Sequence, residues 1–509
     1  MEPGELLFGA ATDPGQVCDV LASRYRLRIE PPAASRWTCL DTADWRLHKA
    51  GMTLRDERRG RARALLLTDG APKPITAPAP PQRWPRRIAA LPASSVRDRI
   101  APAVGERALL PLAEVEVRSL TLLLLDEEEK TRVRVQVDQQ RLAGDRHAAL
   151  PLRVLVSPLR GYERDGRRCT ELLTEAITRV NGANGSAAAA FIAAGQVPGQ
   201  PAVVPPALDP DAPATVSTVA VLRRWLDTID AVRPGVLADV DIEYLHDMRT
   251  SVRATRSLLR LGAGLLPEGR TARFADEFAW LGALTTPVRD LDVYLLELDG
   301  RGATDLTGLT ELEPLRRLLA GQRRRALAQL RSGLESPRGR TISTSWHAVL
   351  DDIAALDIPG PTTREAAAAL ARTAYRDVVK AARPVSDQTS PDQLHRLRRR
   401  CKRMRYLLDG YGSIYAREPR RAVLSALKSL QDCLGVIQDV AVQSEHTGEL
   451  ATALNRRGVA PETLLAMGAL RERGRHRQAE ARRTMARRMT RFCGSKTRAQ
   501  VAALGSVAQ

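Results

Sequence analysis

Tyr244-Leu-His-Asp-Met-Arg-Thr-Ser-Val-Arg-Ala-Thr-Arg-Ser-Leu-Leu259 is the stretch that decides the fold of this chain, because its residues follow a helical repeat. Residues at offsets of 0, 3, 7 and 10 lie on one face of an α-helix. The basic residues at these offsets are His246, Arg249, Arg253 and Arg256. An apolar stripe lies beside them, at Leu245, Met248, Val252 and Leu259. The stretch therefore predicts a helix with one buried face and an adjacent basic face.

The same pattern returns 149 residues later. The second basic stripe is His395, Arg398, Lys402 and Arg405. The second apolar stripe is Leu394, Leu397, Cys401 and Leu408. Asp290 follows the first histidine by 44 residues, and Asp439 follows the second histidine by the same 44. One offset superimposes all these features, which indicates an internal duplication of a helical bundle.

The two aspartates have two interpretations. Asp290 and Asp439 could orient the basic residues, or they could cap the N-terminus of the following helix. Capping is the favoured interpretation at this point.

The composition indicates a partner with negative charge. The chain has 509 residues, a net charge of +19 and a pI of about 10.4. Only seven of its 78 basic residues are Lys, so 71 are Arg, whose planar fork binds phosphate oxygens bidentately. A biased genome composition would give the same excess of Arg.

Other sequence features favour a cytoplasmic protein that carries no cofactor. The six Cys are scattered without a Cys-x-x-Cys pair, which suits reduced thiols and offers no zinc site. The first residues lack the pattern of a signal peptide, and no apolar run approaches the roughly 20 residues that span a bilayer. No membrane partner is expected.

A Pro-rich segment divides the chain into two regions. We predict a strand-rich α+β domain over residues 1–194, a linker over 195–215, an all-α domain over 216–495 and a tail over 496–509. A further Pro-rich run, Ala71 to Arg87, is expected to be a loop. The predicted strands are Ala64–Thr68, Val115–Asp126, Arg132–Asp138 and Leu152–Val156, with helices at Gly15–Arg26 and Arg167–Asn181. The predicted helices of the second region are Val219–Val232, Ile242–Leu261, Thr271–Leu284, Asp290–Leu298, Leu315–Leu334, Arg364–Ala382, Pro391–Tyr411, Pro419–Leu434 and Pro461–Phe492.

A row of cations along one helix face favours an anionic ligand. Like charges in line repel one another, and a linear polyanion relieves that repulsion while its counterions are released. A basic face that only meets water would show the same residues. The repetition of the stripe, with its histidine, favours the ligand.

The helical motifs resemble those of the CHAD domain, the conserved histidine α-helical domain. The resemblance rests on His246-Asp-Met-Arg-x3-Arg253-x2-Arg256, on the run from His395 to Leu408, and on Val288-Arg-Asp-Leu-Asp292 with Leu430-Gln-Asp-x-Leu-Gly435. It covers about Val216 to Phe492, although Ala254 and Thr255 replace the Arg and Leu that the family commonly has. It implies two four-helix bundles with a basic surface that binds inorganic polyphosphate and can direct a protein to polyphosphate granules. The implied binding residues are His246, Arg249, Arg253, Arg256, His395, Arg398, Lys402 and Arg405.

The first region resembles the CYTH domain of the triphosphate tunnel metalloenzymes. The resemblance rests on Asp41-Thr-Ala-Asp-Trp-Arg-Leu-His-Lys-Ala-Gly-Met-Thr-Leu-Arg55 and the later strands. The family's Glu-x-Glu-x-Lys is missing, because Glu2 and Glu5 are three apart and no Lys follows before Lys49. The resemblance therefore implies a degenerate tunnel, with no catalytic residues and no metal such as Mg²⁺ unless the domain is active.

Two further observations complete the prediction. Glu114 and Glu116 alternate along a strand, which fits either a tunnel wall or, as we prefer, a face in solvent. Nucleic acid is a possible partner by charge, but the 4% aromatic content does not favour it, because single-strand binders stack bases on aromatic rings. A triphosphatase or polyphosphatase of the CYTH type remains the alternative function.

Overall fold

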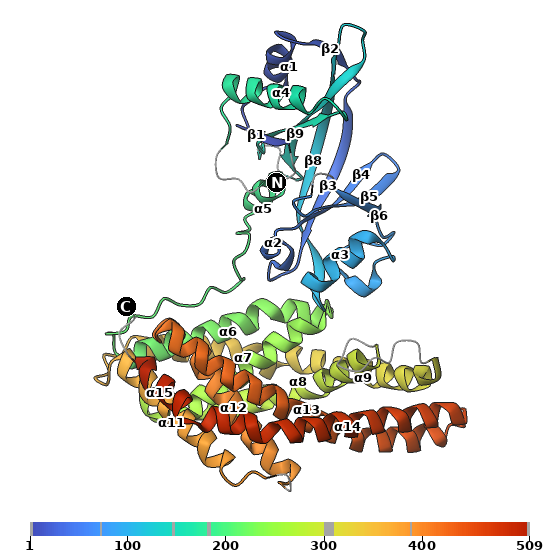
Figure 1. The fold of residues 1–509 in the computed structure, drawn as a ribbon. Helices are drawn as coiled ribbons and strands as arrows, with labels where there is room; N and C mark the ends of the chain where they lie inside the picture. Colours follow the sequence, from blue (N-terminus) through green and yellow to red (C-terminus); the bar gives the residue numbers. More distant parts are fainter. Residues whose placement is uncertain are drawn as a thin grey trace. The chain divides into compact units, whose positions relative to one another are not determined.

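The structure, a computed structural model, describes residues 4–71, 74–144, 148–180, 185–299, 310–386 and 389–505. The chain forms two compact units, Met1–Ala202 and Val203–Gln509 (Figure 1). The first unit is built on an antiparallel sheet and the second is helical, so the predicted division into an α+β region and an all-α region is confirmed.

The first unit contains, within the described residues, one antiparallel sheet of ten strands. The order of the main path is β1-β10-β9-β8-β3-β4-β5-β6, with β2 and β7 both paired to β8. Short apolar runs between turn residues build these strands, and the long β8 alternates buried and exposed residues. The strands are β1 (Glu5–Phe8), β2 (Arg26–Ile29), β3 (Ala33–Asp41), β4 (Thr53–Arg59), β5 (Ala62–Thr68), β6 (Ile75–Pro78), β7 (Arg86–Arg87), β8 (Ala108–Leu125), β9 (Thr131–Leu142) and β10 (Leu152–Pro158).

All four predicted strands are confirmed, but the Pro-rich run from Ala71 to Arg87 is not simply a loop. It contains β6 and β7, because Ile75 and Ala77 pack into the core beneath β5 and their backbone pairs with that strand. The helices of this unit are α1 (Pro14–Ala22), α2 (Arg46–Lys49), α3 (Ser95–Val104), α4 (Glu163–Ala176) and α5 (Ser186–Ala193). Both predicted helices exist in shorter form, as α1 and α4, and Asn181 lies outside the described residues.

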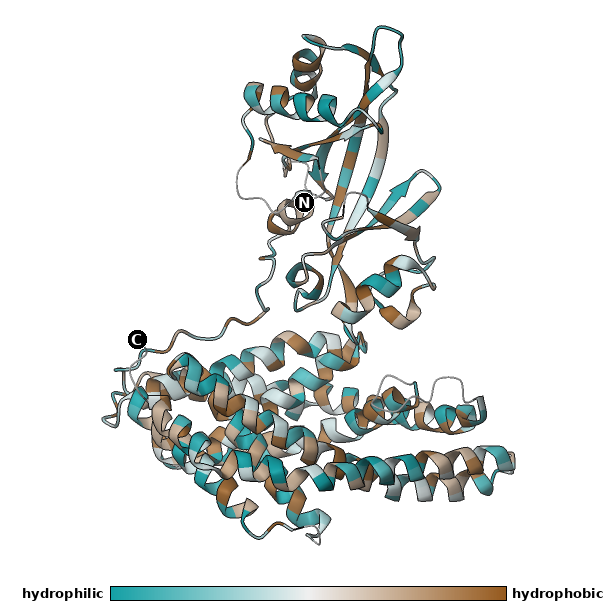
Figure 2. Ribbon diagram, viewed as in Figure 1, coloured by the Kyte–Doolittle hydropathy of each residue, from teal (hydrophilic) through white to brown (hydrophobic). Residues whose placement is uncertain are grey.

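The second unit is built from helices. Its helices are α6 (Ala214–Ala238), α7 (Ile242–Leu261), α8 (Ala272–Leu298), α9 (Glu313–Glu335), α10 (Pro337–Ala354), α11 (Thr363–Ala382), α12 (Pro391–Gly410), α13 (Arg417–Asn455), α14 (Pro461–Cys493) and α15 (Ser495–Ala502). Each of the long helices buries one stripe and exposes another (Figure 2). The buried stripes of these helices meet in one continuous apolar core.

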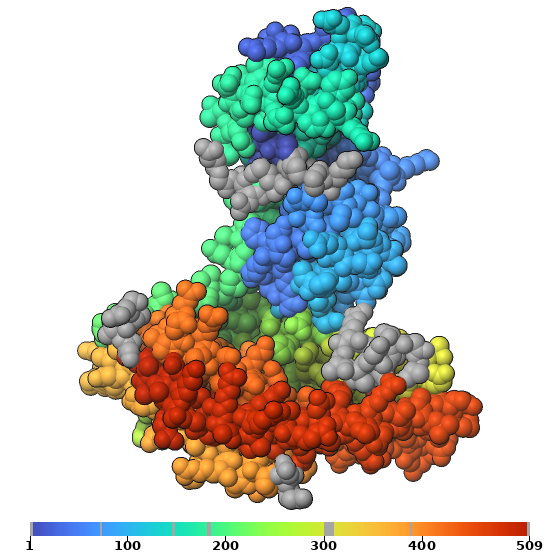
Figure 3. All heavy atoms as spheres, viewed as in Figure 1, coloured from blue at the N-terminus to red at the C-terminus, as the bar shows by residue number. Residues whose placement is uncertain are grey.

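Four helices differ most from the prediction, and one of them, α15, lies over residues that were predicted to form the tail. The segments Thr271–Leu284 and Asp290–Leu298 form one helix, α8, which continues through Pro287 because residues on both sides of the proline are packed in the core. α13 runs for 39 residues instead of ending at Leu434, and it packs along α14 (Figure 3). α10 was not predicted, although Ser336 caps its start by accepting a hydrogen bond from the Gly339 amide.

The helices repeat with the offset seen in the sequence. α7 and α12 begin at Ile242 and Pro391 and end at Leu261 and Gly410, so both ends are 149 residues apart. The starts of α6 and α11 have the same separation. The arrangement as two four-helix bundles stays a prediction. Among the described residues, no helix combines the length and apolarity that crossing a bilayer requires.

Candidate functional site

The two helices that carry the basic stripes are fixed by caps and by their buried faces. The side chain of Asp241 accepts hydrogen bonds from the Glu243 and Tyr244 amides at 2.9 and 3.1 Å, which starts α7. Ser390 caps α12, and Pro391 occupies its first turn. The predicted apolar stripes are buried on both helices, with every member at most 9% exposed. The basic stripe of each helix therefore faces away from the core, as predicted.

The basic residues of α7 and α12 meet at one cleft of about 360 Å³, whose third wall is α8. We call this the basic cleft. Its basic lining residues are Arg249, Arg253, Arg256 and Arg260 of α7 with His395, Arg399, Lys402 and Arg403 of α12. Ala279, Gly282, Ala283, Thr285 and Thr286 of α8, with Ser257 and Tyr406, complete the lining. Within the described part of the chain, no Asp or Glu lines it.

Five of the eight predicted binding residues line the basic cleft, and three do not. The five are Arg249, Arg253, Arg256, His395 and Lys402. Arg398 instead donates to the Asp439 carboxylate at 2.8 Å. The guanidinium of Arg405 lies 3.6 Å from Asp409 on its own helix. His246, the third, lies close to Arg289 and Glu243.

The proposed capping role of the two aspartates is wrong. Asp290 lies inside α8 and Asp439 inside α13, so neither is at a helix start. Asp439 instead holds Arg398, and the charge of Arg249 acts on Asp290. Burial nevertheless raises the pKa of Asp290, with the nearby Asp439 adding to the effect. The alternative interpretation, that these residues orient the cations, fits the geometry.

Arg249 joins α7 to α8 at the floor of the cleft. Its Nη1 atom donates to Thr286 Oγ1 at 2.8 Å and Thr285 Oγ1 at 3.1 Å. Neutral hydroxyl acceptors fix the side chain without cancelling its charge. Arg249 therefore holds its positive charge at a defined position in the cleft, within reach of the Asp290 charge.

The other cations of the cleft have no carboxylate partner among the described residues. Within that part of the chain, no ion pair or hydrogen bond involves the guanidinium groups of Arg253, Arg256, Arg260, Arg399 or Arg403. By contrast Arg323 of α9, which lies outside the cleft, donates to Asp239 at 2.6 and 2.8 Å and to Asp292 at 2.5 Å. Arg323 is thus paired with carboxylates inside the protein, whereas these five guanidinium groups of the cleft meet no carboxylate within the described residues.

Burial and the crowding of positive charge lower the pKa values of several cleft residues. Burial, followed by the charges of Arg253 and Arg398, lowers the pKa of Lys402 from 10.5 to about 7. Burial also lowers the pKa of Arg256, with Arg399 as the next cause. The same two kinds of cause, loss of water and nearby cations, lower the pKa of His395. An anion in the cleft would reverse these shifts.

Three cleft residues were missed by the sequence analysis. Arg260 follows Arg256 by four residues, Arg399 follows His395 by four, and Arg403 follows Arg399 by four. This i, i+4 continuation places them on the same faces as the predicted residues. The prediction kept only positions that repeat with the offset of 149, and these three do not repeat. An unduplicated extension of each stripe was therefore the signal that could have found them.

Two arginines on the N-terminal sheet, Arg153 and Arg55, show the opposite arrangement, because each is matched by an acid. Arg153 of β10 is 1% exposed and donates to Glu5 at 3.0 Å and to Asp138 at 2.6 Å. Arg55, of β4, lies 3.6 Å from Glu57 and stacks 4.3 Å from the centre of the Trp37 ring. We call these residues the paired-arginine face. Its charged groups neutralise one another inside the protein.

Other residues of the N-terminal prediction are placed as follows. Glu114 and Glu116 are exposed, and Glu116 accepts from Arg36 at 2.7 Å beside a pocket of about 820 Å³, so the choice between a tunnel wall and a solvent face stays a prediction. Glu2 lies outside the described residues. Within the described ranges, no three His, Cys, Asp or Glu residues are grouped so that they could hold a metal ion.

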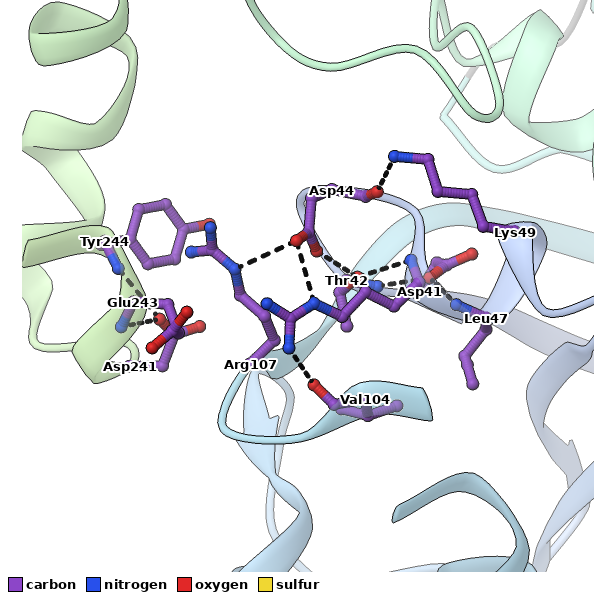
Figure 4. A network of polar contacts seen from close by, with 11 residues as sticks. Asp41, Thr42, Asp44, Leu47, Lys49, Val104, Arg107, Asp241, Glu243 and Tyr244 are labelled. Atoms are coloured by element: carbon purple, nitrogen blue, oxygen red, sulfur yellow. Dashed lines mark hydrogen bonds and ion pairs between the residues drawn. The ribbon is translucent and has the colours of Figure 1, made fainter. Parts of the chain in front are cut away.

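The motif that carried the CYTH resemblance builds a corner of the fold. Asp41 accepts hydrogen bonds from the amides of Thr42 and Leu47 at 2.7 and 2.9 Å (Figure 4). It also accepts one from the His48 amide at 2.8 Å. Arg46 donates to the Asp44 carboxylate at 2.9 Å, and Lys49 donates to the Asp44 carbonyl at 2.7 Å. These contacts fix the turn from β3 into α2. The CYTH identity of this unit stays a prediction.

The chain was compared with known families and relatives. Residues 220–448 match the family model of the CHAD domain, and the prediction of that domain is confirmed there. Two uncharacterized proteins of Mycobacterium tuberculosis, from strains CDC 1551 and H37Rv, are each 30% identical over 314 residues. The match covers 58% of this chain and 57% of each relative, so the chain spans little more than half of their length.

Solved structures were also similar to parts of the chain. The crystal structure of the CHAD domain from the plant Ricinus communis is 25% identical, with a TM-score of 0.45, over 59% of this chain and 96% of that one. PptA from Streptomyces chartreusis is 17% identical, with a TM-score of 0.42, over 54% and 99%. The putative adenylyl cyclase HpAC1 from Hippeastrum, described as having a dominant triphosphatase activity, is 14% identical, with a TM-score of 0.25, over 38% and 95%.

Proposed function

We propose that the CHAD domain of residues 220–448 binds inorganic polyphosphate in the basic cleft. The observation that carries the proposal is the gathering of unpaired cations from two helices with no carboxylate among the described lining residues. The partly buried cations of this cleft are crowded together without a carboxylate among the described lining residues, and an anion would stabilise their charged forms.

The shape and chemistry of the cleft support a linear chain of phosphates. Arg249, Arg253, Arg256 and Arg260 occupy three turns of α7, about 16 Å of helix, and face the cations of α12 across the cleft. Guanidinium forks bind phosphate oxygens in pairs, and each phosphate of a linear chain carries charge. A chain lying in the cleft would meet cations from both sides along its length.

The proposed contacts are the eight basic residues of the cleft. They comprise Arg249, Arg253, Arg256, Arg260, His395, Arg399, Lys402 and Arg403. Arg398 is proposed to act indirectly, through its ion pair with Asp439 on α13. We propose no contact for His246 or Arg405. The duplicated pair of bundles would supply the frame, because it brings two copies of one basic helix to a common cleft.

Two wider consequences belong to the same proposal. Binding in the cleft would place the protein at polyphosphate granules in the cytoplasm. The N-terminal unit, a degenerate CYTH domain in this proposal, would act as scaffold or partner surface, because the charges of its paired-arginine face are already neutralised.

The proposal is tested by competition. Long-chain polyphosphate and double-stranded DNA of equal total charge are titrated, at physiological salt, against a fluorescent polyphosphate probe bound to the full chain. Polyphosphate should displace the probe at far lower concentration than DNA. Equal displacement by both would leave a generic basic surface and would reject the proposal.

A variant of the cleft locates the binding. Replacing Arg253 and Lys402 by Glu should weaken polyphosphate binding by at least about 100-fold, because two charge-assisted contacts are lost and repulsion is added. The matched control replaces Arg317 and Arg421 by Glu. Their side chains are 77% and 80% exposed and lie outside the cleft, and the change in charge is the same. Circular dichroism verifies the helical content of both variants. An equal loss in the control would reject the cleft as the site.

A further inference from the structure

The 149-residue repeat relates the residues of the basic cleft to those of a second pocket, and the two pockets differ in charge. Arg260, Arg399 and Arg403 line the basic cleft. Their counterparts at the offset of 149 are Asp409, Thr250 and Ala254. All three counterparts line another pocket, of about 570 Å³, between α6, α7 and the end of α12. The repeat thus provides two related positions, and only one of them is strongly basic.

Tyr406 stands between the two pockets, because it lines both of them. Arg253 and Lys402, which are counterparts of each other, lie on the cleft side of this boundary. On one side of this pair the lining gains cations from both helices. On the other side the lining combines neutral residues with two acids, Asp247 and Asp409, and two cations, Arg224 and Arg420.

One of the two acids of the second pocket, Asp409, is engaged by cations. Asp409 lies 3.6 Å from the Arg405 guanidinium and 3.7 Å from that of Arg420. These cations are therefore matched by a carboxylate, unlike those of the basic cleft. A phosphate chain that passed Tyr406 would meet the Asp409 charge and would have to compete with it for Arg405 and Arg420.

We infer that polyphosphate extends to only one side of the pair Arg253 and Lys402. Its path runs from this pair to Arg260 and Arg403, and on the other side Tyr406 and Asp409 end it. The inference rests on the proposed function and names the residues that set its specificity. Its consequence is that the site recognises a short segment. Chains longer than that segment gain no further contacts within the helical unit.

Pairs of equivalent residues provide the test. Arg256 and Arg405 are counterparts at the offset of 149 and have the same chemistry, but only Arg256 lines the basic cleft. The affinity of the full chain for tripolyphosphate and for size-fractionated long-chain polyphosphate is measured by calorimetry. Arg256→Ala should weaken both by about 10-fold, as expected for a lost charge-assisted contact. Arg405→Ala should change both by less than about 2-fold, the size of an exposed ion pair.

A gain-of-function variant tests the boundary itself. Thr250→Arg combined with Asp409→Asn gives the second pocket one of the cations of the basic cleft and removes Asp409, one of the two acids that line it. This variant should strengthen binding of the long chain by about 10-fold and leave that of tripolyphosphate unchanged. The control is Thr250→Gln with Asp409→Asn, which adds a long polar side chain without charge and should give a smaller gain.

The outcomes separate the inference from the proposed function. If Arg256→Ala and Arg405→Ala weaken binding equally, the path crosses both pockets and the inference is overturned, while the cleft still binds polyphosphate. If the gain-of-function variant strengthens both ligands alike, Asp409 acts only through long-range charge and the boundary at Tyr406 is rejected. If the unmodified chain binds neither ligand, the proposed function fails as well.

Discussion

The paired-arginine face of the N-terminal sheet and the basic cleft of the helical unit use the same residue in opposite ways. On the sheet, Arg153 is enclosed by Glu5 and Asp138, and its charge is cancelled inside the protein. In the cleft, Arg253 and its neighbours face one another, with no carboxylate in the described lining. The lesson is that an excess of Arg does not identify a binding surface. A binding surface is identified by a cluster of Arg side chains that lack carboxylate partners.

This comparison predicts that the two regions respond differently to mutation. A paired Arg is needed for stability, and its loss leaves buried acids without a partner. An unpaired Arg in a cluster costs stability in the absence of ligand and is needed for binding. The predictions below test both halves of the contrast, beginning with the largest expected effect.

The largest effect is expected when the buried ion pairs of Arg153 with Glu5 and Asp138 are broken. Arg153→Leu leaves Glu5 and Asp138 buried beside each other and should lower the free energy of unfolding by about 3–5 kcal/mol. Urea denaturation monitored on the first unit measures it. Arg134→Leu, at an exposed position of β9, is the control and should stay within about 0.5 kcal/mol. A loss below 1 kcal/mol for Arg153→Leu would show that these ion pairs are not structural.

A smaller effect is expected from pH acting on Lys402. In the free protein the pKa of this side chain is about 7, and a bound anion would raise it, so binding takes up a proton. Affinity should therefore be highest below pH 7 and should fall, by about 10-fold, as the pH rises to about 9. Calorimetry over this range measures the affinity. Lys402→Arg, which stays charged, should remove most of the dependence.

The lowered pKa of Lys402 makes affinity fall with rising pH, but it makes the stability of the ligand-free protein rise with pH. The unfolded chain holds a proton on Lys402 up to a pKa near 10.5, whereas the folded protein releases it near 7. The unfolded state thus binds more protons between these values, and stability from this group should rise with pH across the window. An affinity that stayed constant with pH in the unmodified chain would contradict the assignment of Lys402 to the site.

The smallest effect is expected from removing one cation of the cleft. Arg399→Gln relieves repulsion on Arg256 and Arg403 and should raise the free energy of unfolding by about 0.5 kcal/mol without ligand. The same variant should weaken polyphosphate binding. Thermal unfolding without polyphosphate measures the gain in stability. Thermal unfolding with polyphosphate measures the loss of stabilisation by the ligand. A destabilised Arg399→Gln protein would indicate that Arg399 has a structural partner and would weaken the contrast between the two regions.

Much of the fold could be read from the sequence because its periodicities are strong. The bounds of the helix at Ile242–Leu261 were predicted to the residue, since Asp241 caps one end and the apolar stripe continues to the other. The errors arose where tertiary packing overrides a local signal. Pro287 does not end α8, and the Pro-rich run near Ile75 forms a strand, because core contacts hold both segments.

The site could be predicted only in part because sequence repeats do not report partners. The offset of 149 located Arg253 and Lys402, which lie together in the cleft. It also selected Arg398 and Arg405, whose guanidinium groups turn toward Asp439 and Asp409. It missed Arg260 because its counterpart is an acid. Where an Arg side chain finds a carboxylate depends on helices that are distant in the sequence.

The most direct test of the basic cleft is the reactivity of Lys402 toward a limiting amount of an amine-acylating reagent, followed by mass spectrometry. The seven lysines of the chain can be quantified separately. At pH 7, Lys402 should react faster than Lys130, whose side chain is 69% exposed and paired with Glu128, because the lowered pKa of Lys402 leaves much of its amine neutral. Long-chain polyphosphate should slow the labelling of Lys402 and leave that of Lys130 unchanged. Polyphosphate that binds the protein while Lys402 is labelled at its original rate would contradict the account.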